Sequence, residues 1–253
     1  MAPKLLELCC GTKSISRAFE ARGWWTVTVD IDLACEPDIW QDVRTIRPGE
    51  YPFQNWKPGA FDAIWASPPC QHYSIARSKA KTPRDLETAD AVAQACLRLI
   101  AQLAPASWFV ENPGTGMLHK RPFMAPGTAL APGENFPHQG DHAPTALRKP
   151  REITYCAYQI PPLYRKLTHI WTNLGTEWQP RPICKKHEGS DNRCSPCRRL
   201  GHHRSSAQKG PSYPNHMVMD RFSTRELYHM PRALCDEIAQ AAETRLQSLE
   251  TNP

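Results

Sequence analysis

The first third of the chain alternates short apolar runs with a segment of helical periodicity. Residues 5–8 and 26–30 predict strands, and residues 14–22, whose apolar positions recur at helical spacing, predict a helix between them. Asp30 then stands at the tip of the second strand. A strand, tight turn, helix and strand ending in an acid is the layout of a nucleoside-binding half-fold.

Two further apolar runs, residues 62–67 and 107–110, flank residues 84–103, whose small and apolar positions follow a helical period. A crossover helix of this kind joins parallel strands, so both strands should end at the same edge of the sheet. Cys70 follows the first strand and Glu111 leaves the second. Because open α/β sheets bind ligands at this edge, we expect a nucleophile and an acid in one cleft.

The second half of the chain is less regular. Residues 114–150 are rich in proline, glycine and histidine and predict a loop, residues 151–156 and 169–173 predict strands, and residues 231–249 predict a last helix. A chain of 253 residues can bury one α/β core with a small appendage. We therefore expect an α/β fold with a Rossmann-like sheet.

Composition bears on the cellular compartment of the protein and on the kind of partner it would bind. The start of the chain lacks a signal peptide and there is no apolar run that could span a bilayer, so we expect an intracellular protein in which the ten cysteines serve as thiols, metal ligands or a nucleophile. The net charge is +6, with basic residues crowded into residues 181–204. Such a stretch suits a nucleic acid, although a charge run is as often a solvated face.

Cys70 has a structural and a catalytic interpretation. A single cysteine after a strand is usually a core residue. However, Pro68 and Pro69 remove two backbone donors and stiffen the turn, which suits a presented side chain better than a packed one. We also expect nearby positive groups or helix amides to lower the pKa of the Cys70 thiol.

Pro69-Cys70-Gln71, Glu111-Asn112-Pro113 and the opening run of residues 5–11 together resemble the cytosine-5 DNA methyltransferases, most closely the solitary forms carried by phages and viruses. The resemblance implies a class I methyltransferase fold that transfers a methyl group from S-adenosylmethionine to carbon 5 of cytosine in DNA, with a flipped cytosine as the partner. In that family the cysteine adds to carbon 6 of the base and the glutamate holds ring nitrogen 3.

The resemblance also assigns the cofactor site. The first turn would hold the methionine part of the cofactor, one acid both ribose hydroxyls and another acid the adenine amine. These roles fall on Cys9, Cys10, Gly11, Thr12, Asp30, Ile31, Asp42 and Val43, with Ser67 and Pro69 beside them. A carboxylate such as Asp30 suits a diol because its two oxygens accept from both hydroxyls.

The base would be lined by the two motifs and by a third, which in the family carries two arginines. Here Arg165 and Lys166 supply charge, and His169 stands where the second arginine is expected. We therefore predict Arg165 as the contact to the base carbonyl. The other predicted substrate-binding residues are Gln71, Tyr73, Ser74, Asn112, Lys166 and His169.

A ligand-rich stretch follows the third motif. Cys184, His187, Cys194 and Cys197 form two close pairs in a segment with few apolar residues, which is typical of structural Zn²⁺. His202 could replace His187, so the fourth ligand stays open. By resemblance this stretch occupies the target-recognition position. The expected organisation is a catalytic domain over residues 1–173, a zinc-stapled region over residues 174–215, and residues 216–253 packing back on the catalytic domain.

Two other functions remain open at this stage. One branch of the family methylates transfer RNA with the same cysteine and glutamate. The first turn also departs from the family's phenylalanine and two spaced glycines, with Cys9, Gly11 and Lys13 here, and His169 stands in place of an arginine. A zinc-containing DNA-binding protein with an inactive core would explain these departures. An intact pair of Cys70 and Glu111 argues against the inactive form. We expect a monomer that does not associate with membranes.

Overall fold

A computed structural model of the protein describes residues 1–75, 77, 80–131, 146–158, 164–184 and 224–251. Within them, seven strands form one mixed sheet in the order β3-β2-β1-β4-β5-β7-β6. The strands are β1 (Lys4–Leu8), β2 (Trp25–Asp30), β3 (Ile39–Trp40), β4 (Ala63–Ala66), β5 (Ser107–Pro113), β6 (Arg151–Thr154) and β7 (Leu167–Thr172).

The strand register brings the candidate motifs to one edge. β1 pairs in parallel with β2 and β4, and β4 pairs in parallel with β5, so that Leu8, Ala66 and Val110 lie side by side. β7 runs antiparallel to β5 and β6. The predicted crossover and the common edge for the cysteine and glutamate motifs are therefore confirmed.

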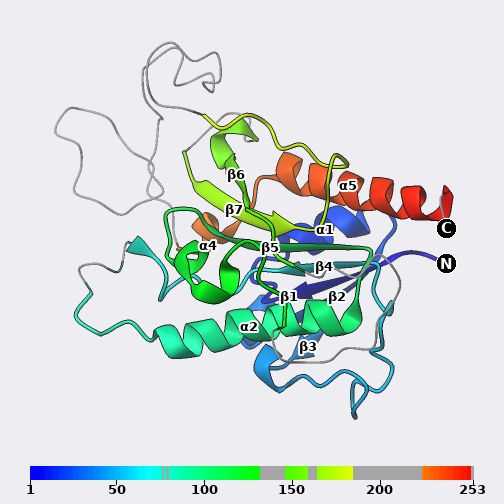
Figure 1. Ribbon diagram of the computed structural model, residues 1–253, viewed down its shortest axis with the longest axis horizontal. Helices are drawn as coiled ribbons and strands as arrows, with labels where there is room; N and C mark the ends of the chain where they lie inside the picture. Colours follow the sequence, from blue (N-terminus) through cyan, green and yellow to red (C-terminus); the bar gives the residue numbers. More distant parts are fainter. Residues whose placement is uncertain (76, 78–79, 132–145, 159–163, 185–223, 252–253) are drawn as a thin grey trace.

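Helices cover both faces of the sheet (Figure 1). The helices α1 (Ser14–Glu20) and α5 (Arg232–Thr251) lie on one face and α2 (Leu86–Leu103) lies on the other, while α4 (Thr224–Tyr228) is a short helix before α5. Two apolar cores match this division, one built around α2 and one around α1 and α5. The α5 helix is also attached to the segment after α1, because Arg22 Nε donates to Glu243 Oε1 at 2.9 Å.

The structure corrects several element bounds. β5 continues to Pro113, so Glu111 lies inside a strand and not after it, because β7 pairs with β5 as far as Thr168 opposite Pro113. β6 ends at Thr154, where a short 3-10 turn, η6 (Tyr155–Ala157), begins. The two-residue strand β3 was not predicted, since a strand this short leaves no periodic pattern.

Several short 3-10 turns lie between these elements. They are η1 (Leu33–Cys35), η2 (Val43–Thr45), η4 (Leu118–Lys120) and η5 (Pro122–Met124). The predicted loop over residues 114–150 thus contains two turns, and residues 132–145 lie outside the described ranges. Most of the predicted zinc-stapled insertion also lies outside them.

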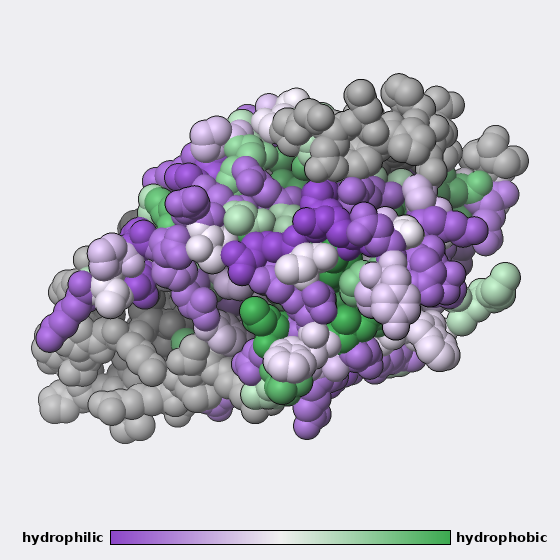
Figure 2. Space-filling model, turned by 90° about the horizontal axis from the view of Figure 1, so that it is seen from below, coloured by the Kyte–Doolittle hydropathy of each residue, from purple (hydrophilic) through white to green (hydrophobic). Residues whose placement is uncertain are grey.

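None of the described helices combines the length and apolarity that a bilayer crossing needs. On the face shown in Figure 2, hydrophilic residues dominate and the apolar ones form small, separate groups.

Candidate active site

The Cys70 loop is held from both sides. The chain leaves β4 at Ala66, and the Pro68 carbonyl then accepts a hydrogen bond from Asn112 Nδ2 at 2.9 Å, which joins the loop to β5. The Cys70 carbonyl accepts from the Tyr73 and Ser74 amides at 3.0 and 2.8 Å and so closes a tight turn. Cys70 itself is half-buried. The loop is thus fixed to both neighbouring strands, and the catalytic role of Cys70 stays a prediction.

Glu111 is a buried carboxyl with an open hydrogen-bonding position. The residue is 9 % exposed, and within the described part of the chain its Oε1 has no hydrogen-bond partner. Burial raises the pKa of the Glu111 carboxyl above its ordinary value. A buried polar atom that the protein leaves unsatisfied is costly and is suited to a ligand that brings its own partner.

The charges of Cys70, Glu111 and Lys166 act on one another. Burial, and then the negative charge of Glu111, raise the pKa of the Cys70 thiol, while Lys166 works in the opposite direction. Lys166 also lowers the pKa of Glu111 against the effect of burial. The expectation that its surroundings lower the pKa of Cys70 is therefore wrong for this structure, because burial and a neighbouring carboxylate outweigh one ammonium group.

The side chains of the two basic residues before β7 contact different parts of the protein. Lys166 Nζ lies 4.7 Å from the centre of the Tyr155 ring and donates to the Leu227 carbonyl at 3.2 Å. Arg165 Nε instead donates to the Cys184 carbonyl at 3.0 Å. Lys166 is thus the cation whose charge acts on both Cys70 and Glu111, and the contact of Arg165 with a base stays a prediction.

His169 lies on the other face of the sheet from Glu111. It pairs across strands with Asn112, and because neighbouring residues on a strand face opposite sides, both side chains lie toward α2. His169 Nε2 is 3.4 Å from Glu152 Oε1, and its ring lies 5.0 Å from the ring of His119. Burial, and then the neighbouring His119, lower the pKa of His169.

The segment after Cys70 presents some side chains and buries others. Gln71 is exposed and Ser74 is half-buried. Tyr73 is 0 % exposed, and its hydroxyl donates to Asp90 Oδ1 on α2 at 2.8 Å. Tyr73 therefore anchors the loop from beneath, and contacts of Gln71, Ser74 and Asn112 with a base stay predictions.

The first turn is tied to the tip of β2. Asp30 Oδ2 accepts from the Gly11 amide at 2.9 Å and Oδ1 accepts from the Asp32 amide at 2.9 Å. Cys9 and Gly11 both take positive φ, 55° and 49°, and apart from Gly11 and its two chain neighbours no described atom lies within 4 Å of where a Gly11 side chain would begin. Each Asp30 oxygen keeps a further lone pair, so this turn is open and can still accept two hydroxyl donors.

The other predicted cofactor residues surround this turn. Ile31 is 63 % exposed and Val43 is buried, while Arg44 pairs with Asp42 and holds the pKa of that carboxyl below its ordinary value. Trp40 was missed by the sequence reasoning: it is 62 % exposed and its Nε1 donates to the Ile31 carbonyl at 2.8 Å. Only the unpredicted strand β3 brings Trp40 to this edge.

The last predicted cofactor residues are engaged within the protein or exposed. Thr12 Oγ1 lies 2.8 Å from the Ser14 hydroxyl, and Ser67 Oγ accepts from Trp65 Nε1 at 2.7 Å. Cys10 is buried beneath the turn and Pro69 is exposed beside Cys70. These contacts shape the turn from within.

The predicted metal ligands are divided by the limits of the described residues. Cys184 is buried and its amide donates to Thr154 Oγ1 at 2.9 Å. His187, Cys194, Cys197 and His202 lie outside the described ranges. Within those ranges no cluster of three or more histidine, cysteine or acidic residues could hold a metal ion.

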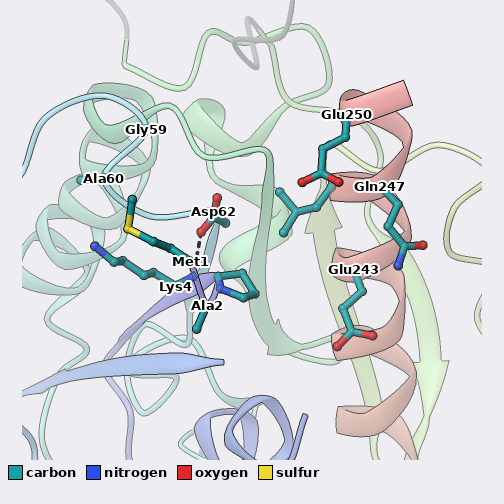
Figure 3. Close-up of a pocket in the computed structure, with 11 residues that line it drawn as sticks. Met1, Ala2, Lys4, Gly59, Ala60, Asp62, Glu243, Gln247 and Glu250 are labelled. Atoms are coloured by element: carbon teal, nitrogen blue, oxygen red, sulfur yellow. Dashed lines mark hydrogen bonds between the residues drawn. The ribbon is translucent and has the colours of Figure 1, made fainter. Parts of the chain in front are cut away.

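A hollow of about 400 Å³ lies away from these residues, at the opposite edge of the sheet. Met1, Lys4 and Asp62 line one side of it, and Glu243 and Glu250 of α5 line the other (Figure 3). Lys4 begins β1 and Asp62 precedes β4, so the hollow faces the amino ends of the strands. Cys70 follows the carboxyl end of β4 and Glu111 lies near the carboxyl end of β5, so the hollow is not the candidate active site.

Comparison with known proteins gives one informative relative. A protein of Frog virus 3 (isolate Goorha), named as a DNA (cytosine-5)-methyltransferase, is 30% identical over 185 residues, which cover 68% of this chain and 71% of the relative. No family profile matches the chain.

Solved structures resemble the chain more distantly. A protein encoded in an E. coli prophage and described as a DNA modification methyltransferase is 16% identical with a TM-score of 0.48, covering 72% of this chain and 52% of its own. The DNMT2 protein of Spodoptera frugiperda is 16% identical with a TM-score of 0.41, covering 68% and 49%. The chain thus spans about half the length of these two structures.

Proposed function

The chain belongs to the DNA (cytosine-5)-methyltransferases, a family of enzymes, and we propose that it transfers a methyl group from S-adenosylmethionine to carbon 5 of cytosine in DNA. The observation that carries the proposal is the buried Glu111, whose Oε1 has no partner among the described residues and whose charge acts on Cys70. This pair offers a nucleophile and a proton donor to one planar base.

Cys70 is the nucleophile of the proposed reaction. Carbon 5 of cytosine is a poor nucleophile until a group adds to carbon 6, so the Cys70 sulfur forms a bond to carbon 6 and electron density moves to carbon 5. Carbon 5 then takes the methyl group. Its proton leaves to a base or water, and the bond between Cys70 and carbon 6 breaks.

Glu111 supplies the proton at ring nitrogen 3 of the base. Its raised pKa favours the protonated carboxyl, which can donate to ring nitrogen 3 as the sulfur attacks. A protonated Glu111 also removes the negative charge that raises the pKa of Cys70. Lys166, on the same face, stabilises the Cys70 thiolate and the Glu111 carboxylate that remains after proton donation.

The first turn fits S-adenosylmethionine. This cofactor supplies an electrophilic methyl group. Asp30 has one lone pair left on each carboxylate oxygen for the ribose hydroxyls, and Gly11 leaves open space above the turn. Ile31 and Trp40 present exposed apolar surface beside Asp30, which suits the adenine ring.

A zinc-bound recognition region accompanies this site in our proposal. Cys184, Cys194 and Cys197 would hold one Zn²⁺ together with a further ligand, which spacing alone leaves as His187 or His202. Cys184 supports this role because it is buried and fixed to Thr154 at the end of β6. The basic residues around it would contact phosphates of DNA, from which the target cytosine must swing out to reach Cys70.

Methyl transfer tests the proposed function directly. The purified protein, incubated with S-adenosylmethionine labelled in its methyl group, should label duplex DNA, and digestion should release the label as 5-methylcytosine. Label that enters transfer RNA and not DNA would establish the RNA alternative. Cofactor binding without transfer to either nucleic acid would instead favour the inactive DNA-binding protein.

A further inference from the structure

We propose that the Tyr155 hydroxyl positions the ionised Glu111 carboxylate by donating a hydrogen bond to Oε1, and that the Thr168 hydroxyl in turn donates to the Tyr155 oxygen. This inference rests on the proposed function, because it gives a partner to the acid of that site. Tyr155 is a positioning residue, which acts on the reaction through Glu111 and does not touch the base. The short sequence motifs assign a role to neither hydroxyl.

The strand register places Glu111 and Thr168 on one face of the sheet. Glu111 lies opposite Ile170 in the antiparallel pair of β5 and β7, and Thr168 is two residues before Ile170. Residues two apart on a strand face the same side, so the Thr168 side chain lies on the Glu111 side of the sheet. Ile170 belongs to the core around α1 and α5, and this is therefore the face that those helices cover.

Tyr155 reaches the same face from the neighbouring strand. It follows β6 as the first residue of η6, and its amide donates to the Lys166 carbonyl at 3.1 Å. Tyr155 also belongs to the same apolar core as Ile170. Lys166 Nζ lies 4.7 Å from the centre of the Tyr155 ring, and its charge acts on Glu111. Tyr155 and Glu111 thus share one cation.

Three buried polar atoms on this face make no hydrogen bond within the described part of the chain. They are the Tyr155 hydroxyl, the Thr168 hydroxyl and Glu111 Oε1. Tyr155 and Thr168 are both 0 % exposed, so water does not replace the absent partners at their side chains. Unsatisfied atoms of this kind are costly. An ionised Glu111 needs donors, and the two hydroxyls are donors that the rest of the described protein leaves unused.

The charges around Tyr155 fit a donor to Glu111. Burial, and then the negative charge of Glu111, raise the pKa of Tyr155, while Thr168 acts in the opposite direction. Tyr155 therefore keeps its proton. The other titratable groups whose charges act on Tyr155 or Glu111 are Lys166, Cys70, Cys235 and Tyr164. Because a carboxylate has about four acceptor positions, a bond from Tyr155 leaves Glu111 able to meet the base.

Infrared titration of the full-length protein tests this assignment. The band of the protonated Glu111 carboxyl is identified by its loss in Glu111→Gln, and its pH dependence gives the pKa of Glu111. Tyr155→Phe retains the ring but removes a donor to the carboxylate, so it should raise the pKa of Glu111 by about 1. The control Tyr158→Phe removes another buried hydroxyl of the same core, which accepts from the Arg181 amide, and should leave that pKa unchanged.

Thr168→Val keeps the test decisive if Tyr155→Phe fails to fold. It removes the donor to Tyr155, so it should raise the pKa of Glu111 in the same direction by less, and Thr168→Ser should keep the parent value. A pKa of Glu111 in Tyr155→Phe or Thr168→Val equal to that in Tyr158→Phe would overturn the assignment.

Methyl transfer gives a second readout. In Tyr155→Phe the carboxylate that remains after proton donation lacks a donor, so kcat should fall about tenfold, and the limb of the pH profile that reports Glu111 should move to higher pH. An active parent with an unshifted profile in Tyr155→Phe would also overturn the assignment. The infrared readout requires no methyl transfer, so failure here is distinct from failure of the proposed function.

Discussion

The environment of Cys70 opposes the ionisation that its proposed role needs. The proposed reaction needs a thiolate, but burial and the negative charge of Glu111 raise the pKa of the thiol. Lys166 acts against both effects, and it also lowers the pKa of Glu111. A single ammonium group thus biases two titrating groups toward their charged forms, and the balance shifts further once Glu111 carries a proton. The ionisation of Cys70 is therefore coupled to that of its neighbours.

Removing the Lys166 charge should move the pH dependence of the reaction. In Lys166→Met the pKa of Cys70 rises further, so the methyl-transfer rate at pH 7 should fall about tenfold or more, and the optimum should move to higher pH. Lys166→Arg should keep most of the parent profile. Rates measured from pH 6 to 10 check this, and an unshifted optimum in Lys166→Met would remove the lysine from this role.

Sequence motifs predicted where the candidate residues lie along the strands better than which face of the sheet each side chain occupies. Cys70, Glu111 and Asp30 follow from short motifs at strand ends, and their neighbourhood was predicted from the parallel crossover. The sequence did not show which of Lys166 and His169 lies on the same face of the sheet as Glu111, because the faces depend on the register of β7 against β5. A shift of one residue in that register would exchange the two faces.

At the scale of elements, the β1–α1 unit contains a buried acid that the sequence did not reveal. Glu7 on β1 is 3 % exposed, and its Oε2 accepts from the Ser16 amide at the start of α1 at 3.0 Å. Burial raises the pKa of Glu7 to about 7. Glu7 therefore joins β1 to α1 next to the turn that connects them, and its raised pKa favours the protonated form.

The buried Glu7 should make the stability of the folded protein depend on pH. Because the pKa of Glu7 is higher in the folded than in the unfolded state, the folded state binds the extra proton, and stability falls as pH rises from about 4.5 to about 7. Over that window the loss attributable to Glu7 is at most about 3 kcal/mol.

Glu7→Gln removes the proton-binding step and retains an amide that can accept from Ser16. Denaturant unfolding at pH 5 and pH 8 should show a smaller drop in stability for this variant than for the parent. Glu87→Gln is a suitable control, since Glu87 is an exposed acid on α2, the helix on the other face of the sheet. An equal drop in Glu7→Gln and the parent would show that Glu7 does not contribute.

The bounds of the helices and strands show where hydrophobic periodicity does not predict the structure. The helices over residues 14–22 and 84–103 were predicted to within two residues at each end, because a long apolar stripe marks them. The extension of β5 through Glu111 to Pro113 was missed, since the polar end of a strand carries no apolar signal. It is stabilised by pairing with β7, a contact distant in sequence.

At the scale of the whole molecule, the mixed sheet collects parts that are far apart in the chain. The proposed cofactor-binding turn, residues 9–12, follows β1, Asp30 ends β2, Cys70 follows β4 and Glu111 lies in β5, all toward one edge. The antiparallel β7 then brings Lys166 to the same side as Glu111. In this account the edge holds the cofactor and base, and the segment reaching Cys184 links them to DNA recognition.

The most direct test of this account is covalent trapping of the full-length protein on a DNA duplex that carries 5-fluorocytosine at the target. Fluorine cannot leave as the carbon 5 proton does, so we predict an adduct that survives denaturation and contains Cys70 in the peptide linked to DNA. Cys70→Ser should form none, and Cys235→Ser should form it normally. An adduct through another cysteine, or none from protein that methylates ordinary DNA, would contradict the account.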